Sequence, residues 1–431
     1  MTALRTLCAA AALTLFAGVA FAQPVLIRNA RVHTMGPAGV IEAGDVLLND
    51  GVIQAVGVDV AAPAGATVIE ADGKVVTPGL FAAYSNLGLG EWGLDAEAND
   101  ETTRDNFPLS AALDATDAFN STSSLIAINR AGGVTRALTA PEPGSKLFGG
   151  QAAVVDLSGR IASVTKARAA QNAVLGYAGA ARAGDSRLGA FAVMRGYLDE
   201  TKAYAANPRD YKSRARDNDM TFADLAALVP VVEGRQPMIV AVDSAVDIRG
   251  LIRLKTDYAV NVIVLGGTEA WRVARELAAT NIPVILDPAA NLPGSYEDLG
   301  STLANAARLQ SAGVKIAFYN PDGGATHNLR LLTQQAGNAV AHGLPYEAAL
   351  AALTVNPATM YGLGDRLGSI EPGKAGDVVV WDGDPLEVTT RAVAVFIDGR
   401  AMSMQNRQTR MRERYKSLER GDLPFAYRGQ D

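Results

Sequence analysis

The fold is decided by residues 76–88, which read VTPGLFAAYSNLG. An apolar run follows the Pro-Gly pair and predicts a buried strand. Because side chains in a strand alternate between its two faces, Ala82, Tyr84 and Asn86 are expected on one inward side. A neutral phenol and a neutral amide are poor ligands for Zn²⁺ or Fe²⁺, since neither has the basicity of imidazole.

A second informative block lies near the other end of the chain, at residues 371–386, which read EPGKAGDVVVWDGDPL. In their order and spacing, the two blocks resemble the anchoring motifs of the amidohydrolase superfamily. The first is similar to the opening barrel strand, and the second is similar to the segment where the chain leaves the barrel. Within the superfamily, the chain most resembles the imidazolonepropionase-like branch.

This resemblance implies an α/β fold, a TIM-like (β/α)8 barrel with a small β-sandwich domain built from the N- and C-terminal segments. We expect a signal peptide at 1–22 and the barrel at 76–365. The β-sandwich is expected to combine residues 23–75 with residues 366–402, and a helical tail should occupy 403–431.

The pattern of residue types along the chain agrees with this division into domains. Short apolar runs separated by turns predict strands between Val25 and Ile69, and Asn49-Asp50-Gly51 is a hairpin signal. After about residue 78, β-branched runs alternate with Ala- and Leu-rich stretches, the pattern of a parallel βα barrel. The candidate barrel strands are 133–139, 238–243, 260–265, 283–287 and 314–319. Helices are expected over 197–204, 221–232 and 405–420, the first two as outer helices or a lid and the last as a docking or dimer contact.

The first residues predict export. A charged start at Arg5 precedes the apolar run Leu7–Val19 and the small-x-small exit Ala20-Phe21-Ala22, as in a secretory signal. The mature chain should therefore begin near Gln23 and be periplasmic, without a transmembrane anchor. Cys8 is the only cysteine, so a mature chain would have no disulfide, thiolate nucleophile or Cys-bound metal.

Composition narrows the choice of partners. Without Arg5, 38 basic residues stand against 45 acidic ones, a balance that argues against nucleic acid as a partner. We expect a small-molecule substrate or ligand, and a homo- or hetero-oligomer with a related barrel.

The resemblance also locates the positions where the family carries metal ligands. The Asp and the His-x-His pair of the opening strand correspond to Ala82, Tyr84 and Asn86. The strand-five histidine falls at or near Asp243, and the strand-six histidine falls near Gly266 or Gly267. The strand-eight aspartate corresponds to Asn320, Pro321 or Asp322. No metal is assigned; a divalent ion follows from family analogy alone, and its usual ligands are largely missing.

Histidine is scarce throughout the chain, which contains His33, His327 and His342. His33 is assigned to the N-terminal sheet and His342 to a helical region away from the barrel mouth. His327 is a candidate for substrate binding, and equally for the start of a helix. One imidazole cannot build a His-rich binuclear site.

Carboxylates follow several of the candidate strands. Asp243, Glu269 and Asp287 come after successive strand ends and could converge with Asp322 at the barrel mouth. Oxygen ligands alone would suit Mg²⁺ or Ca²⁺ better than zinc, and each residue could instead cap the helix that follows. Asp243, Asp287 and Asp322 are the candidate catalytic residues, with Asp243 or Asp287 as general base.

The remaining candidates are donors to a substrate. Tyr84, Asn86 and Arg136 could hydrogen-bond a substrate carbonyl, and Arg104 could bind a substrate carboxylate through both ends of its guanidinium. Glu269 joins them as a substrate-binding candidate. A surface Arg-Asp pair such as Arg104-Asp105 is also commonly solvated and contributes little.

Two functions follow from these observations. The first is an exported hydrolase of C–N bonds in an amide, lactam or dipeptide-like molecule, which the resemblance implies. The second is a catalytically inactive barrel that binds a small molecule or serves as a scaffold, paired with an active relative. No cofactor is expected for either.

Overall fold

The computed structural model describes residues 23–91, 99–104, 106–214, 220–321 and 328–416. Asp322 and His327, the predicted signal peptide and the end of the predicted tail lie outside these ranges. Among the described helices, none is both long and apolar enough to cross a membrane.

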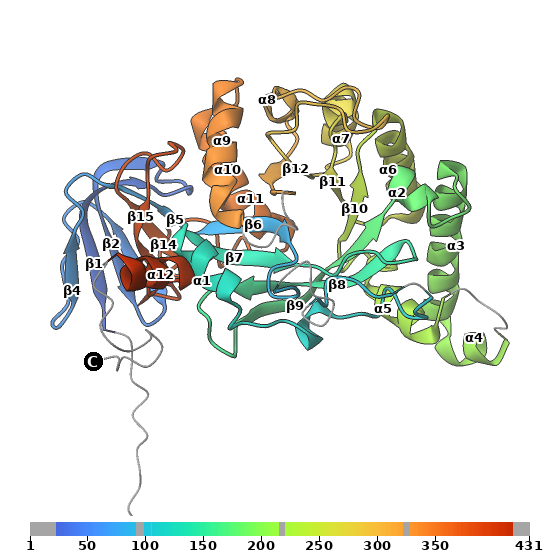
Figure 1. The fold of residues 1–431 in the computed structure, drawn as a ribbon, viewed down its shortest axis with the longest axis horizontal. Helices are drawn as coiled ribbons and strands as arrows, with labels where there is room; N and C mark the ends of the chain where they lie inside the picture. Colours follow the sequence, from blue (N-terminus) through green and yellow to red (C-terminus); the bar gives the residue numbers. More distant parts are fainter. Residues whose placement is uncertain (1–22, 92–98, 105, 215–219, 322–327, 417–431) are drawn as a thin grey trace, which may run out of the picture.

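The barrel is an eight-stranded sheet that curls on itself in the middle of the molecule (Figure 1). Its order follows the chain from β6 to β13, and the inner face buries apolar side chains that include Phe81, Ile239 and Ile285. The strands are β6 (Leu80–Ser85), β7 (Val134–Thr139), β8 (Phe148–Asp156), β9 (Val164–Val174), β10 (Met238–Val242), β11 (Val262–Gly266), β12 (Val284–Leu286) and β13 (Ile316–Phe318). The predicted barrel is confirmed, and five of these strands overlap the five predicted ones.

One strand departs from the expected all-parallel pattern. β8 pairs antiparallel with both β7 and β9, whereas the other neighbours in the barrel are parallel. β7, β8 and β9 are therefore joined by short connections without the crossover helix that parallel neighbours require. β8 extends beyond the end of β7. There its edge pairs with a segment from earlier in the chain, and the Gln151 amide donates to the Leu113 carbonyl at 2.7 Å.

Helices cover the outside of the barrel, and the longest, α3, packs against α5 at the edge farthest from the small domain (Figure 1). Its buried apolar residues belong to the same cluster as the outer faces of the strands, which favours the outer-helix prediction. The helices are α1 (Ser124–Ala131), α2 (Gly176–Ala180), α3 (Arg187–Ala206), α4 (Pro208–Arg214), α5 (Phe222–Val232), α6 (Ala245–Tyr258), α7 (Ala274–Ala279), α8 (Asn305–Ser311), α9 (Leu332–Ala341), α10 (Tyr346–Ala352), α11 (Val355–Met360) and α12 (Arg407–Tyr415). Short 3-10 turns are η2 (Ala115–Asp117), η3 (Ala270–Val273) and η4 (Leu329–Leu331).

The small domain is built from both ends of the described chain, as predicted, and its strands form one continuous sheet. N-terminal strands pair with C-terminal ones where β5 lies antiparallel to β14. At the predicted hairpin, Asp50 and Gly51 both have positive φ, 51° and 85°, as a two-residue turn between twisted strands requires. The strands are β1 (Val25–His33), β2 (Val40–Asn49), β3 (Val52–Gly57), β4 (Thr67–Glu70), β5 (Val75–Pro78), β14 (Val378–Trp381), β15 (Ala392–Ile397) and β16 (Arg400–Ala401).

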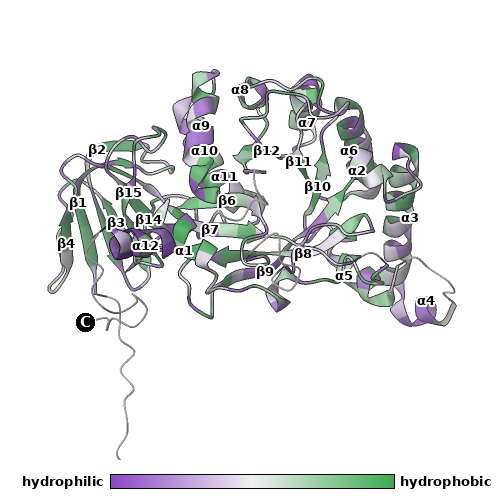
Figure 2. Cartoon of the chain, viewed as in Figure 1, coloured by the Kyte–Doolittle hydropathy of each residue, from purple (hydrophilic) through white to green (hydrophobic). Residues whose placement is uncertain are grey.

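The predicted tail helix is present as α12, which begins with a capping box at Asn406 and is mainly polar on its surface (Figure 2). Just before it, the Ser403 carbonyl accepts a hydrogen bond from Arg130 Nε of α1 at 3.3 Å. The tail is therefore docked against the barrel of its own chain. Two apolar side chains of this helix, Met411 and Tyr415, are 38% and 63% exposed.

Candidate active site

The inner face of the barrel places polar residues at the carboxyl ends of four strands. Ile239 and Ala241 point inward from β10, and period-two alternation continues this face to Asp243. The same alternation leads from Ile285 to Asp287 and from Ala317 to Tyr319. The structure thus brings Asp243, Asp287 and Tyr319 to one end of the barrel, and both carboxylates raise the pKa of the Tyr319 hydroxyl in addition to its burial.

Tyr84 is the fourth member of this group. It lies on β6, which stands at the opposite end of the sheet order from β13. Its hydroxyl accepts a hydrogen bond from Asn172 Nδ2 of β9 at 3.0 Å, and the same Nδ2 donates to the Pro141 carbonyl at 2.8 Å. Because a carbonyl can only accept, this contact fixes the orientation of the Asn172 amide. Tyr84 is therefore the acceptor, and its own proton is left to donate into the barrel. Burial, followed by Glu142, raises its pKa, so Tyr84 stays a neutral donor at neutral pH.

Asn86 lies just beyond the end of β6. Its Nδ2 donates to Glu142 Oε1 at 2.8 Å, whereas its buried Oδ1 has no partner among the described residues. The Oδ1 of Asn172 is also buried and unpaired there. A buried carbonyl oxygen without a donor is costly.

Asp243 is held by the loop after β11. Its Oδ1 accepts hydrogen bonds from the Thr268 amide at 3.1 Å and from Thr268 Oγ1 at 2.7 Å. A Cβ on Gly266, which has φ +87°, would lie 2.6 Å from this oxygen, so only glycine fits there. Oδ2 has no hydrogen-bond partner in the described part of the chain. Burial raises the pKa of Asp243, although Thr268 opposes the shift.

The other carboxylate candidates hold loops. Asp287 Oδ1 accepts from the Ala289 amide at 2.9 Å, a local turn contact. Glu269 joins two segments of the rim, because Oε1 accepts from the Gly300 amide at 2.9 Å and Oε2 accepts from the Ala245 amide at 3.2 Å. Ala245 is the first residue of α6, so this bond agrees with the capping alternative. The helix that Glu269 caps follows β10, however, and not β11, the strand that precedes Glu269.

Two predicted donors lie away from this group. Arg104 is exposed. Arg136 sits toward the amino-terminal end of β7, where Nε and Nη2 donate to the two oxygens of Asp377 at 2.6 and 3.0 Å, and Nη2 donates to Asp398 at 2.5 Å. Burial alone would lower the pKa of Arg136, but Asp377 and Asp398 raise it above its ordinary value. Arg136 therefore joins the barrel to the small sheet and does not face Tyr84.

Two of the three histidines also lie outside the group. His33 ends β1, where its Nδ1 lies 3.0 Å from Glu347 Oε1 of α10. His342 follows α9, with its Nδ1 2.7 Å from the Asn338 carbonyl. Both lie in the elements that the sequence assigned to them.

Three residues of the mouth escaped the sequence reasoning. Tyr319 closed a predicted strand, and its two-residue spacing from Ala317 was the signal that could have identified it. Asn172 gave no signal because β9 was not recognised. Glu297 comes from the long loop between β12 and α8, and no pattern tied it to the barrel.

The described residues do not fit the metal site of the family. None of the described His, Cys, Asp and Glu side chains gather in groups of three or more that could hold an ion. The raised pKa of Tyr84 opposes a phenolate, and the Asn86 amide is already bound to Glu142.

The comparisons with known proteins agree with this architecture. The Amidohydrolase family matches residues 251–405. The chain is 28% identical to an imidazolonepropionase from Acidiphilium cryptum, over 84% of this chain and 94% of that protein. It is 47% identical to the amidohydrolase tasK of Hapsidospora irregularis over 74 residues, which span 17% of this chain and 8% of tasK.

A solved structure extends the match to the whole fold. The crystal structure of an amidohydrolase from Thermotoga maritima superimposes with a TM-score of 0.79 and 29% identity, covering 88% of this chain and 100% of that one. The two terminal motifs, the barrel, the small sheet made from both ends of the chain and these matches lead to one conclusion: the chain has the fold of the amidohydrolases and is similar to that family along most of its length.

Proposed function

We propose that this chain hydrolyses carbon–nitrogen bonds of a small amide at the carboxyl end of the barrel, with Asp243 as general base and without the usual metal pair. One observation carries the proposal. A carboxylate with a free oxygen, Asp243, shares the inner face with two neutral phenols, Tyr84 and Tyr319. This set combines a base with donors, which is the minimum that amide hydrolysis requires.

The chemistry can be written with these residues alone. Asp243 Oδ2 takes a proton from a water molecule, and the resulting hydroxide adds to the amide carbon. The carbonyl oxygen becomes negative and accepts hydrogen bonds from the hydroxyls of Tyr84 and Tyr319. The C–N bond then breaks as Asp243 returns the proton to the departing nitrogen, which leaves a carboxylic acid and an amine.

The two unpaired amide oxygens support the same substrate class. Asn86 Oδ1 and Asn172 Oδ1 are buried acceptors and would receive N–H groups of an amide or lactam. A ligand with both a carbonyl and N–H groups would satisfy the donors and acceptors of the mouth together.

The proposal is tested by hydrolysis of a panel of small amides, lactams and dipeptides by the purified protein, before and after dialysis against a chelator. We expect turnover that resists the chelator and falls by roughly 10²- to 10⁴-fold in Asp243→Asn, the range of general acid–base catalysis. Glu233→Gln, an exposed carboxylate beside Arg235, is the matched control. Turnover lost to the chelator would refute the metal-free mechanism, and no turnover on any amide would favour the inactive, ligand-binding barrel.

Export completes the proposal. The charged start, apolar run and small-x-small exit of residues 1–22 support secretion to the periplasm, where the substrate would then be found.

A further inference from the structure

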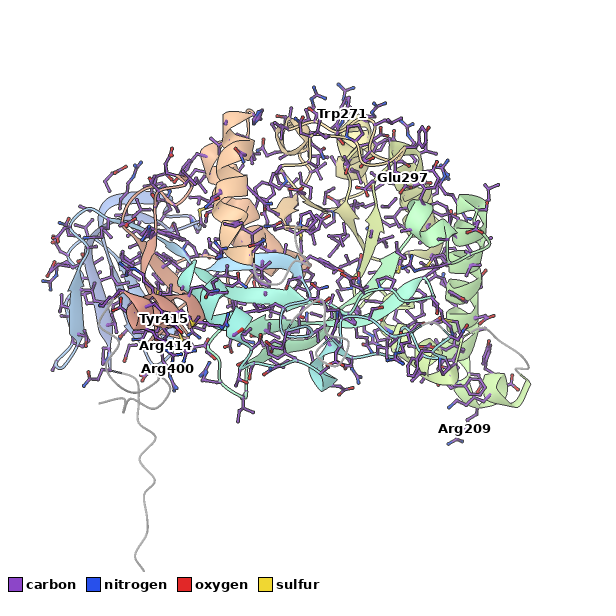
Figure 3. The ribbon with its side chains drawn as sticks, viewed as in Figure 1. Arg209, Trp271, Glu297, Arg400, Arg414 and Tyr415 are labelled. Atoms are coloured by element: carbon purple, nitrogen blue, oxygen red, sulfur yellow. The ribbon has the colours of Figure 1, made fainter. Side chains whose placement is uncertain are left out.

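A second feature of the mouth is a cavity at its rim, about 470 Å³ in volume. It is formed by the start of α2 and the loop between β12 and α8, and its lining includes Tyr177, Tyr296, Glu297 and Leu299. Figure 3 labels Glu297 above the barrel strands. The cavity therefore combines one carboxylate with two aromatic side chains.

The carboxylate of Glu297 is fixed in place. Its Oε1 accepts a hydrogen bond from the Tyr177 amide at 2.7 Å. Gly176 has φ +66°, and a Cβ there would lie 2.5 Å from Oε1. Glycine is thus required both by the backbone conformation and by the close approach of the carboxylate. Oε2 makes no hydrogen bond within the described ranges.

One of the two aromatic rings is free for a ligand. The Tyr177 ring already has the Arg187 guanidinium 5.2 Å from its centroid. Tyr296 is 82% exposed and has no ring, cation or hydrogen-bond partner among the residues described. An aromatic face beside a carboxylate is the arrangement that recognises an organic ammonium group.

The charges around the cavity favour a cation. Asp243 and Asp247 are close enough to raise the pKa of Glu297, and Arg187 acts on it in the opposite direction. Arg187 is already paired with Asp247 at 2.9 Å. Burial, followed by these two aspartates and opposed by the Tyr177 amide and Arg187, raises the pKa of Glu297 to about 7.

We propose that this cavity is a subsite for the protonated amine of the substrate, held by the Glu297 carboxylate and the Tyr296 ring. The inference rests on the proposed function for the position of the scissile bond, which would lie between this subsite and Asp243. It narrows the substrate class to small amides that carry a primary ammonium group.

The subsite has a measurable signature. Because Glu297 titrates near pH 7, part of the population is protonated before a cation binds. An ammonium ligand favours the carboxylate, so its binding at pH 7 should release up to about half a proton to the buffer. A neutral ligand of the same shape should release none.

The experiment is calorimetric titration of the purified protein with benzylammonium at pH 7 in two buffers of different ionisation enthalpy, beside benzyl alcohol as the neutral probe. We expect benzylammonium to bind more tightly than benzyl alcohol, with proton release. Glu297→Gln keeps an acceptor for the Tyr177 amide, and it should abolish the release and weaken binding by about fivefold. Tyr296→Leu should weaken binding by about twofold to fivefold and retain the release. Glu233→Gln should change neither.

Equal affinity for the two probes, or proton release that persists in Glu297→Gln, would overturn the subsite. Two further outcomes for the parent protein separate this inference from the proposed function. If benzylammonium still binds and no amide is hydrolysed by the parent protein, the hydrolase proposal fails and the subsite stands. If amides are hydrolysed and the cation has no preference, the subsite fails alone.

Discussion

The ring of Tyr84 meets the ring of Tyr319 edge to face, with centroids 6.1 Å apart and planes at 89°. The two residues belong to β6 and follow β13, the first and last strands of the hydrogen-bonded order. The pair therefore spans the seam where the barrel sheet meets itself. An edge-to-face pair of this kind contributes about 0.5–1.5 kcal/mol beyond its buried area, so the seam is closed partly by side chains.

The phenol pair leads to a kinetic prediction. Tyr84→Phe and Tyr319→Phe keep the rings and remove the hydroxyls, so each should lower kcat by roughly 10²- to 10³-fold with little change in KM, as expected for an oxyanion donor. The raised pKa of both hydroxyls keeps them protonated, and parent activity should not decline through pH 10, the ordinary tyrosine pKa. Steady-state kinetics over pH measures both. A Phe variant with parental kcat would remove that hydroxyl from the mechanism.

The raised pKa of Asp243 should make activity and stability depend on pH in opposite directions. Because its pKa is raised in the folded protein, activity should increase with pH through that raised value, as the carboxylate base forms. The folded protein loses stability as pH rises from the unfolded pKa to the folded one. Asp243→Asn should therefore unfold at a higher temperature than the parent at pH 7, and the advantage should vanish below the ordinary Asp pKa. Thermal unfolding at pH 3 and pH 7 measures this, and a less stable variant at pH 7 would contradict the prediction.

Removal of the Arg136 guanidinium should lower the free energy of unfolding strongly. Arg136→Met leaves Asp377 and Asp398 without their main cation, so the variant should lose about 3–5 kcal/mol of unfolding free energy. Burial raises the pKa of the Asp398 carboxyl, but Arg136 and Arg160 outweigh burial and hold this pKa below its usual value. This contribution is present above the unfolded pKa and is lost as pH falls through the folded one. Urea unfolding at pH 7 measures the loss, with the exposed Arg249→Met, paired with Glu276, as a control that should behave like the parent.

Metal content is predicted to be low. Purified protein should hold much less than one tightly bound transition metal per chain, because the family resemblance implies that Tyr84, Asn86 and Asp243 stand at or near the positions of imidazole ligands. The variant Tyr84→His, Asn86→His, Asp243→His should take up zinc weakly, since Asn172 and Thr268 are placed to bind a phenol and a carboxylate and not to orient imidazoles. Elemental analysis after dialysis settles both parts. Stoichiometric zinc that resists chelation in the parent would show that other ligands exist.

The mature chain is expected to start at the end of the apolar leader. The Ala20-Phe21-Ala22 exit predicts cleavage just before Gln23. Intact-mass spectrometry of protein recovered from the periplasm should give a chain that begins at or near this residue. A periplasmic form that retains Leu7–Val19 would contradict the prediction.

The sequence predicted the parts of the barrel that local preference and tertiary structure agree on. β10 and β11 are β-branched runs, and both were recognised from that composition. β9 was missed because Val164–Val174 contains Lys, Ala, Arg and Gln, residues that favour helices. Its strand pairing comes from its neighbours β8 and β10.

The candidate site could likewise be predicted only where local sequence determines the structure. Asp243 lay on a recognised strand, and alternation alone placed it on the inner face. The position of Arg136 depended on Asp377 and Asp398, more than two hundred residues away in sequence. Glu297 depended on a loop contact with Tyr177. Contacts of such long range leave no periodic pattern in a single sequence.

The reversed strand β8 also bears on how the barrel assembles. A parallel pair must wait for a crossover segment to fold, whereas β7, β8 and β9 are antiparallel neighbours joined by short connections. Their loop-closure entropy is small, and pairing of low sequence separation forms early. We therefore expect this meander to be the folding nucleus, from which the parallel strands are added in chain order and the seam between Tyr84 and Tyr319 closes last.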